Sequence, residues 1–155
     1  MKILIVCTGN TCRSPMAEGL LRALLEERWE AESCQIISAG TAALEGEPAA
    51  EHAIAVMSEM GIDLAEHRAR SLNIVLIAEA DRILAMTERH RDAVLSMAPE
   101  AVEKIQVLNM ADPFGMSLEV YRECAGQLKE QLEEWVEGIE KEEGAQGRKK
   151  NSGEE

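Results

Sequence analysis

The segment CTGNTCRSP, residues 7–15, places a cysteine and an arginine on either side of five mostly small or polar residues. A cysteine thiolate is a strong nucleophile, and the guanidinium of Arg13 is a planar fork suited to two phosphoryl oxygens. Gly9 and Asn10 both tolerate positive φ, so the backbone N–H groups between Cys7 and Arg13 can turn inward as an anion-binding nest. We expect a phosphate-binding loop made of Thr8, Gly9, Asn10, Thr11, Cys12, Arg13 and Ser14.

The end of this segment predicts the start of a helix. Ser14 suits an N-cap and Pro15 suits the first helical position, so the positive end of the helix dipole would point at the loop. These surroundings favour negative charge on the sulfur of Cys7. We therefore expect in-line attack of Cys7 on a bound phosphoryl group, giving a phosphocysteine that water hydrolyses. This chemistry requires no metal and no other cofactor.

Such a reaction also needs an acid for the leaving group and a base for the water. Asp112, in MADPFG, follows the fourth predicted strand, and Pro113 keeps its backbone out of the helical region. Its carboxylate should reach the mouth of the site, which makes it the expected acid and base. Asp63 and Asp81 are the competing carboxylates. Asp81 precedes a strand, at its amino end, and so should face away from the loop.

The chain alternates short apolar runs with helical patterns, which predicts an α/β fold with a parallel sheet covered on both faces. The expected strands are 2–7, 35–39, 82–86 and 104–109, and the expected helices are 16–29, 48–60, 87–97 and 117–139. Ligands bind such sheets outside the carboxyl ends of the strands, which is where the loop after Cys7 lies. We expect one domain over residues 1–140 and a disordered tail over 141–155.

Composition and charge exclude some classes of binding partner. The chain has 155 residues and a formal net charge of -13, so nucleic acids and anionic membrane surfaces are poor partners. No stretch approaches the roughly 20 apolar residues of a membrane span, which favours a cytoplasmic protein. The four cysteines should then be mainly reduced, and their spacing argues against a zinc site.

Five segments together resemble the low-molecular-weight protein tyrosine phosphatase family, over residues 1–139: CTGNTCRSP, SAGT (38–41), EHRAR (66–70), ADRILAMTERH (80–90) and DPFG (112–115). The resemblance implies a three-layer α/β/α fold of flavodoxin-like type with a four-stranded parallel sheet in the order 2-1-3-4. It also implies Cys7 as nucleophile, Arg13 as phosphate binder and Asp112 as general acid. By the same resemblance, Ser38 and His67 hold Asn10 in place, and Ser14 donates to the thiolate.

The resemblance also bears on the substrate, which we expect to be a phosphorylated protein. Tyrosine-directed members usually carry a bulky aliphatic residue where this chain has Thr11, and an aromatic pair where it has Phe114 and Gly115. A threonine at the position of Thr11 instead resembles the bacterial protein arginine phosphatases. Its short side chain with a hydroxyl suits their polar phosphoguanidinium substrate. We expect phosphoarginine to be preferred and keep a protein tyrosine phosphatase as the alternative. Two other classes are a thiol redox enzyme like the arsenate reductases, which would need two further central cysteines, and a phosphate-binding module without catalysis.

The remaining cysteines and histidines have ordinary interpretations. Cys12 either packs or captures an oxidised Cys7 as a disulfide, as is seen in the family, and both interpretations stay open. Cys34 and Cys124 are expected to be structural. His52 and His90 lie on predicted helices and are expected at the surface. We expect a monomer.

Overall fold

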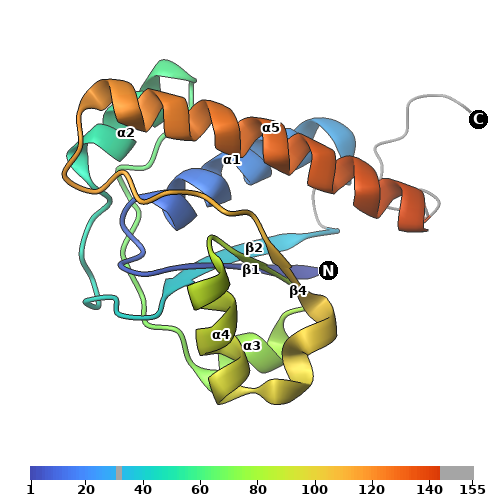
Figure 1. Ribbon diagram of the computed structural model, residues 1–155. Helices are drawn as coiled ribbons and strands as arrows, with labels where there is room; N and C mark the ends of the chain where they lie inside the picture. Colours follow the sequence, from blue (N-terminus) through green and yellow to red (C-terminus); the bar gives the residue numbers. More distant parts are fainter. Residues whose placement is uncertain (31–32, 144–155) are drawn as a thin grey trace, which may run out of the picture.

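A parallel sheet of four strands forms the centre of the computed structural model, which describes residues 1–30 and 33–143 (Figure 1). Its strands are β1 (Lys2–Cys7), β2 (Gln35–Gly40), β3 (Arg82–Ala85) and β4 (Ile105–Val107), in the order β2-β1-β3-β4. The predicted sheet and its order are confirmed. β4 is shorter than expected because Asn109 adopts a left-handed φ of 59°, which takes the chain out of extended conformation.

Helices cover both faces of this sheet and make the predicted three layers. On one face lie α1 (Arg13–Arg28), α2 (Glu51–Glu59) and α5 (Leu118–Glu143). On the other lie α3 (Ile74–Glu79), α4 (Glu88–Met97) and the 3-10 helix η1 (Pro99–Lys104). The carboxyl ends of the strands and the start of α1 lie at the left of Figure 1, so residues that follow different strands meet at that edge.

The central strand β1 shows why both faces need cover. Ile3 and Ile5 belong to the hydrophobic core under α1 and α5, whereas Leu4 and Val6 belong to the core on the α3 and α4 side. All four are at most 2% exposed. Each such side chain contributes about 1.5–3 kcal/mol through burial, so β1 fixes the position of Cys7 at its end rigidly.

The first helix starts earlier than the sequence indicates. Its first backbone hydrogen bond runs from Met16 N to Cys12 O, at 3.1 Å, and α1 begins at Arg13 rather than at residue 16. The expectation that Ser14 caps this helix is therefore wrong. Cys12 occupies the N-cap position without a side-chain cap, and the hydroxyl of Ser14 turns to the loop instead.

Two short elements were not expected from the sequence. The helix α3 spans six residues, too few to show a helical period, and is held at its ends by side chains. The side-chain oxygen of Asn73 accepts the N–H of Leu76 at 2.9 Å, and Lys104 Nζ donates to the last carbonyls of the helix. Lys104 itself belongs to η1, the second unexpected element.

At the other end of the chain, α5 continues to Glu143, past the expected domain boundary at residue 140. The remaining residues of the predicted tail, 144–155, lie outside the described part of the chain. Within residues 1–30 and 33–143, no helix combines the length and apolar character that crossing a membrane requires.

Candidate active site

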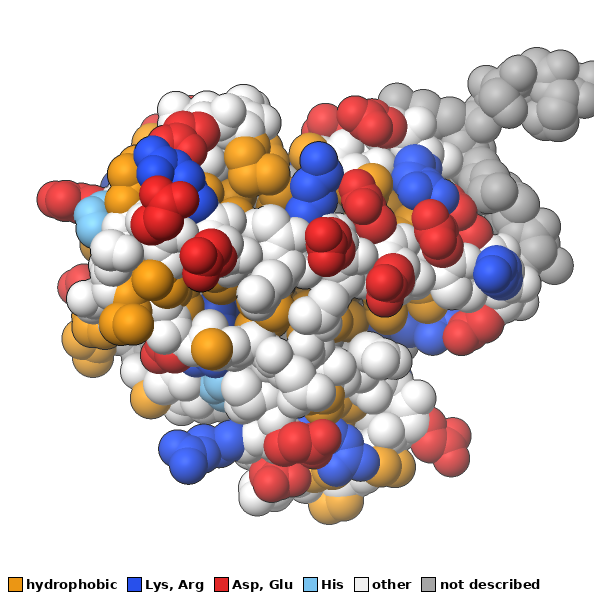
Figure 2. All heavy atoms as spheres, turned by 45° about the horizontal axis from the view of Figure 1, so that its top comes forward, with side chains coloured by type: hydrophobic (Ala, Val, Ile, Leu, Met, Phe, Trp, Pro, Cys, Tyr) orange, Lys and Arg blue, Asp and Glu red, His pale blue; other side chains and the backbone are white. Residues whose placement is uncertain are grey.

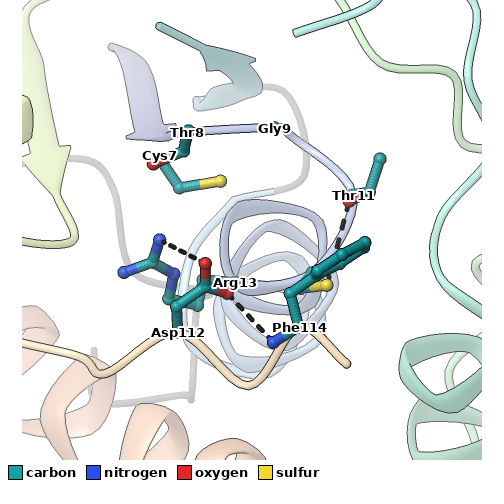
Figure 3. A pocket seen from close by; sticks show the side chains of 8 residues that line it. Cys7, Thr8, Gly9, Thr11, Arg13, Asp112 and Phe114 are labelled. Atoms are coloured by element: carbon teal, nitrogen blue, oxygen red, sulfur yellow. Dashed lines mark hydrogen bonds and ion pairs between the residues drawn. The ribbon is translucent and has the colours of Figure 1, made fainter. Parts of the chain in front are cut away.

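Cys7 lies at the bottom of a cavity of about 190 Å³ at the carboxyl edge of the sheet. Figure 3 shows its sulfur directed into the space that the other lining residues surround, which are Thr8, Gly9, Thr11, Cys12, Arg13, Asp112 and Phe114. The residue is 2% exposed, so a nucleophile at this point meets a ligand inside the cavity rather than in bulk water. The cavity brings together residues from the end of β1, the start of α1 and the segment after β4.

The loop between Cys7 and Arg13 owes its shape to Asn10. This residue has a φ of 59° and is completely buried, and its side-chain oxygen accepts the backbone N–H of Arg70 at 2.9 Å. Its Nδ2 donates to Ser14 Oγ at 2.7 Å and to Ser38 Oγ at 3.0 Å. On the far side, His67 Nε2 lies 2.7 Å from the carbonyl oxygen of Asn10. Ser38 and His67 thus both contact Asn10.

A directed chain of hydrogen bonds leads from this asparagine to the sulfur. Ser38 donates its hydroxyl hydrogen to Glu18 Oε1 at 2.6 Å, so its oxygen is free to accept from Asn10. Ser14 also accepts from Asn10 and keeps its own hydrogen for Cys7 Sγ, which lies 2.9 Å away. A negative sulfur would be stabilised by that donor. Glu18, which accepts from Ser38, was missed by the sequence analysis because nothing in its position along the helix marks it.

Arg13 faces the same cavity from the first turn of α1. Its side chain is 5% exposed, and Nη1 donates to the carbonyl oxygen of Met110 at 2.8 Å. Its Nη2 lies 3.6 Å from Asp112 Oδ2, and that carboxylate is half exposed. The guanidinium is therefore anchored at one corner, and its other nitrogens lie beside the space where phosphoryl oxygens would bind.

Asp112 reaches the mouth of the cavity from the segment after β4 (Figure 3). Its Oδ1 accepts the backbone N–H of Phe114 at 3.1 Å, a turn that holds the carboxylate at the cavity. The two competing carboxylates lie elsewhere. Asp81 accepts the N–H of Lys2 at the amino end of the sheet, and Asp63 accepts that of Ala65 in a loop.

The wall of the cavity combines polar and apolar groups. Thr11 lines it from the loop, and Phe114, which is 69% exposed, supplies the one aromatic ring among its lining residues. Cys12 also lines it, and its sulfur lies 3.2 Å from Tyr121 Oη. Burial raises the pKa of the Cys12 thiol and that of the Tyr121 phenol, so both keep their protons at neutral pH.

His90 is buried beside this site, so the expectation that it lies at the surface is wrong. The residue is 3% exposed in the first turn of α4, and its Nε2 lies 2.7 Å from Thr8 Oγ1. Its Nδ1 lies 2.9 Å from Oγ1 of Thr87, the N-cap of the helix. The capping pattern in TERH was the one available signal, because it places the histidine in the first turn of a helix that starts at the functional edge of the sheet. By contrast, Nδ1 of His52 lies 3.2 Å from Met116 O, and its ring lies edge-on to that of Tyr121.

Comparison with known proteins identifies relatives of this chain. Residues 2–145 match the model for "Low molecular weight phosphotyrosine protein phosphatase". A protein-arginine-phosphatase from Geobacillus stearothermophilus is 39% identical over 150 residues, covering 91% of this chain and 97% of its own. The probable low molecular weight protein-tyrosine-phosphatase EpsP of Ralstonia nicotianae is 36% identical, covering 88% and 94%. The structure of the YwlE arginine phosphatase from Geobacillus stearothermophilus superposes with a TM-score of 0.84 at 38% identity, covering 94% and 96%.

Proposed function

Because the chain belongs to the low molecular weight phosphotyrosine protein phosphatase family and is a cysteine-based phosphatase, we propose that it removes phosphoryl groups from phosphoarginine residues of proteins. The observation that carries this proposal is the cavity wall around Cys7. It presents the hydroxyl of Thr11 and the carboxylate of Asp112, with Phe114 as its single lining aromatic side chain.

The proposed reaction uses the groups that meet in the cavity. Cys7 Sγ attacks phosphorus in line with the leaving group while the loop N–H groups and Arg13 bind the remaining phosphoryl oxygens. As the P–N bond breaks, Asp112 protonates the departing guanidine nitrogen, and the phosphoryl group stays on sulfur. Asp112 then takes a proton from a water molecule that attacks phosphorus. Inorganic phosphate leaves, and the thiolate is restored.

Two features favour a guanidinium over a phenol as the leaving group. Once Asp112 has given its proton to the leaving nitrogen, the guanidinium that forms is a planar cation and pairs with the half-exposed carboxylate, whereas a phenol ring gains nothing from that charge. A phenol ring also binds best between apolar surfaces, and Thr11 replaces one of these with a hydroxyl. The match to a relative named protein-arginine-phosphatase supports the same assignment.

The second candidate is a protein tyrosine phosphatase working by the same mechanism. The exposed ring of Phe114 at the cavity mouth favours it, since a phenol could stack there. The match to a relative named as a probable tyrosine phosphatase does so too. In both cases the substrates are phosphoproteins, and the monomeric state and cytoplasmic location stay predictions.

Turnover of phosphoarginine and phosphotyrosine peptides of the same sequence, by wild type and Thr11→Ile, tests the assignment. We expect wild type to prefer phosphoarginine and the variant to shift toward phosphotyrosine, because isoleucine restores an apolar wall. Thr41→Ile is the matched control, since Thr41 is exposed and does not line the cavity. A wild-type preference for phosphotyrosine would favour the second candidate, and an unchanged preference in Thr11→Ile would remove Thr11 as its determinant.

A further inference from the structure

The imidazole of His90 joins the second residue of the phosphate loop to the start of α4. Thr8 follows Cys7 directly and lines the same cavity, and its hydroxyl is bound to Nε2 of the buried ring at 2.7 Å (Figure 3 shows Thr8 beside Cys7). On its other side the ring is bound by Thr87 through Nδ1 at 2.9 Å. Both ring nitrogens therefore have partners, and both partners are hydroxyls, which either donate or accept.

The ring carries a single N–H in this position. Burial, followed by the positive charge of Arg13, lowers the pKa of His90 to about 4, so the imidazole is neutral at physiological pH. A neutral ring donates from one nitrogen and accepts at the other. The two threonine hydroxyls must consequently take opposite roles.

The neighbours of the ring favour the tautomer that carries its hydrogen on Nε2. Oγ1 of Thr87 already accepts the backbone N–H of His90, at 3.4 Å, as the cap of α4. Its own hydrogen is available for Nδ1, and in that arrangement the ring hydrogen lies on Nε2 and Thr8 Oγ1 is the acceptor. The hydroxyl hydrogen of Thr8 can then point into the adjoining cavity. A phosphoryl anion bound there favours this arrangement, because a Thr8 hydroxyl that donated to Nε2 would face the anion with its oxygen lone pairs.

We propose that His90 is a positioning residue for substrate binding, which holds Thr8 so that the hydroxyl of Thr8 donates a hydrogen bond to the bound phosphoryl group. The inference rests on the proposed function and adds to it a donor from outside the backbone nest and Arg13. It also explains why a helix on the opposite face of the sheet from α1 packs a buried histidine against the loop. From the other side, His67 fixes the same loop through the carbonyl of Asn10.

The affinity for inorganic phosphate tests this inference without reference to turnover. We expect Thr8→Val to weaken phosphate binding roughly tenfold, the size of a hydrogen bond to a charged group. His90→Phe should weaken it to a similar extent, because the hydroxyl loses its orientation. Since both changes remove one interaction, the double variant should bind phosphate no more than about twofold more weakly than the weaker single variant. Thr41→Val, at an exposed residue outside the cavity, should bind as wild type does.

Kinetics and stability separate positioning from a purely structural role. In Thr8→Val the KM for an aryl phosphate should rise more than kcat falls, and the melting temperature should fall because Nε2–H of buried His90 loses this acceptor; a purely structural role would not separate KM from kcat. The proposal would be overturned if the losses in phosphate affinity of the two single variants multiplied in the double variant. So would phosphate binding by Thr8→Val equal to that of wild type.

The ring itself gives a direct test in the unaltered protein, which holds even where His90→Phe folds poorly. The ¹⁵N shifts of His90 in the phosphate complex should show a protonated Nε2 and an unprotonated Nδ1. A proton on Nδ1 would contradict the proposed direction. These binding and NMR results concern Thr8 and His90 alone, whereas failure of the proposed function would appear as absent hydrolysis by wild type.

Discussion

Asp112 and Cys7 act, in the proposed reaction, on opposite ends of the bond that breaks. The sulfur lies deep in the cavity, whereas the carboxylate is half exposed at its mouth and lies 3.6 Å from Arg13 Nη2. The two roles therefore depend differently on the leaving group of the substrate. A nucleophile is needed for every substrate, but an acid matters most when the leaving group is a strong base.

Replacing Asp112 should thus reveal itself through the leaving group. We expect Asp112→Asn to slow turnover by about 10²- to 10⁴-fold for basic leaving groups, the usual contribution of general acid catalysis, and much less for acidic phenols. A series of aryl phosphates with leaving groups of graded pKa measures this. An equal loss across the series would show that Asp112 acts by positioning rather than by proton transfer.

His90 gives a second residue whose chemistry can be followed by pH. Its pKa of about 4 in the folded protein, lowered by burial and then by Arg13, compares with about 6.5 in an unfolded chain. Between these values the unfolded state binds more protons, so the free energy of unfolding must fall as pH falls from 6.5 toward 4.

The size of this effect is measurable by urea unfolding at pH 7 and pH 5. Wild type should lose about 2 kcal/mol through His90 over this interval, and His90→Phe should lose less by that amount because it has no group to protonate. Carboxylates that titrate in the same range affect both proteins equally. Parallel losses in the two proteins would mean that His90 does not titrate in this way.

At the scale of elements, the site depends on how closely β2 approaches the loop that follows β1. Gly40, the last residue of β2, pairs with Cys7 across the sheet, and its N–H donates to the carbonyl of Arg70. A Cβ at this position would collide with the carbonyl oxygen of Thr8 and lie 3.0 Å from the backbone nitrogen of Asn10. Both of these contacts are backbone, so the loop cannot yield by turning a side chain.

Gly40→Ala should therefore distort the phosphate loop. We expect a loss of about 1–3 kcal/mol in the free energy of unfolding, typical of overpacking, together with weaker binding of inorganic phosphate. Gly126→Ala is the matched control, because Gly126 lies on the exposed face of α5 with open space around it. The control should be stabilised by about 0.5–1 kcal/mol, the helix-propensity difference. Wild-type phosphate affinity in Gly40→Ala would contradict the close approach.

The same scale shows what the sequence could reveal. Cys7, Arg13 and Asp112 were predictable because they follow or precede strongly patterned elements whose ends meet at one edge of the sheet. The helix α3 was not, since six residues held by Asn73 and Lys104 leave no periodic signal. The burial of His90 was hidden because its partner Thr8 is 82 residues away in the chain. The start of α1 was misplaced because SP suggests a cap, while the loop geometry continues the helix back to Arg13.

For the whole molecule, the long helix α5 ties the amino-terminal half to the carboxyl end of the described chain. Its outer face carries acidic side chains interspersed with Lys and Arg, as Figure 2 shows. On its inner side Glu140 accepts hydrogen bonds from the guanidinium of Arg28 and, at 2.9 Å, from Nε1 of Trp29, a residue that is 1% exposed. The expected domain boundary at residue 140 thus falls on a residue that anchors the helix.

Removing this carboxylate should destabilise the whole fold. Glu140→Ala leaves the indole N–H of Trp29 buried without this acceptor, so we expect a loss of about 2–3 kcal/mol in the free energy of unfolding. Glu142→Ala removes an exposed ion pair with Arg82 and should cost at most about 1 kcal/mol. Urea unfolding of both variants gives the comparison. Equal losses of unfolding free energy would show that the hydrogen bond from Trp29 to Glu140 contributes no more than a surface ion pair.

The central claim is that the sulfur of Cys7 attacks phosphorus, and Cys7→Ser tests it most directly. Hydrolysis of an aryl phosphate and binding of inorganic phosphate are measured on the same preparation, with Cys34→Ser, altered outside the cavity, as the control. We predict that Cys7→Ser loses turnover while still binding phosphate, because the loop N–H groups and Arg13 remain, and that the control keeps both. Sustained hydrolysis by Cys7→Ser at a rate near that of wild type would contradict the account.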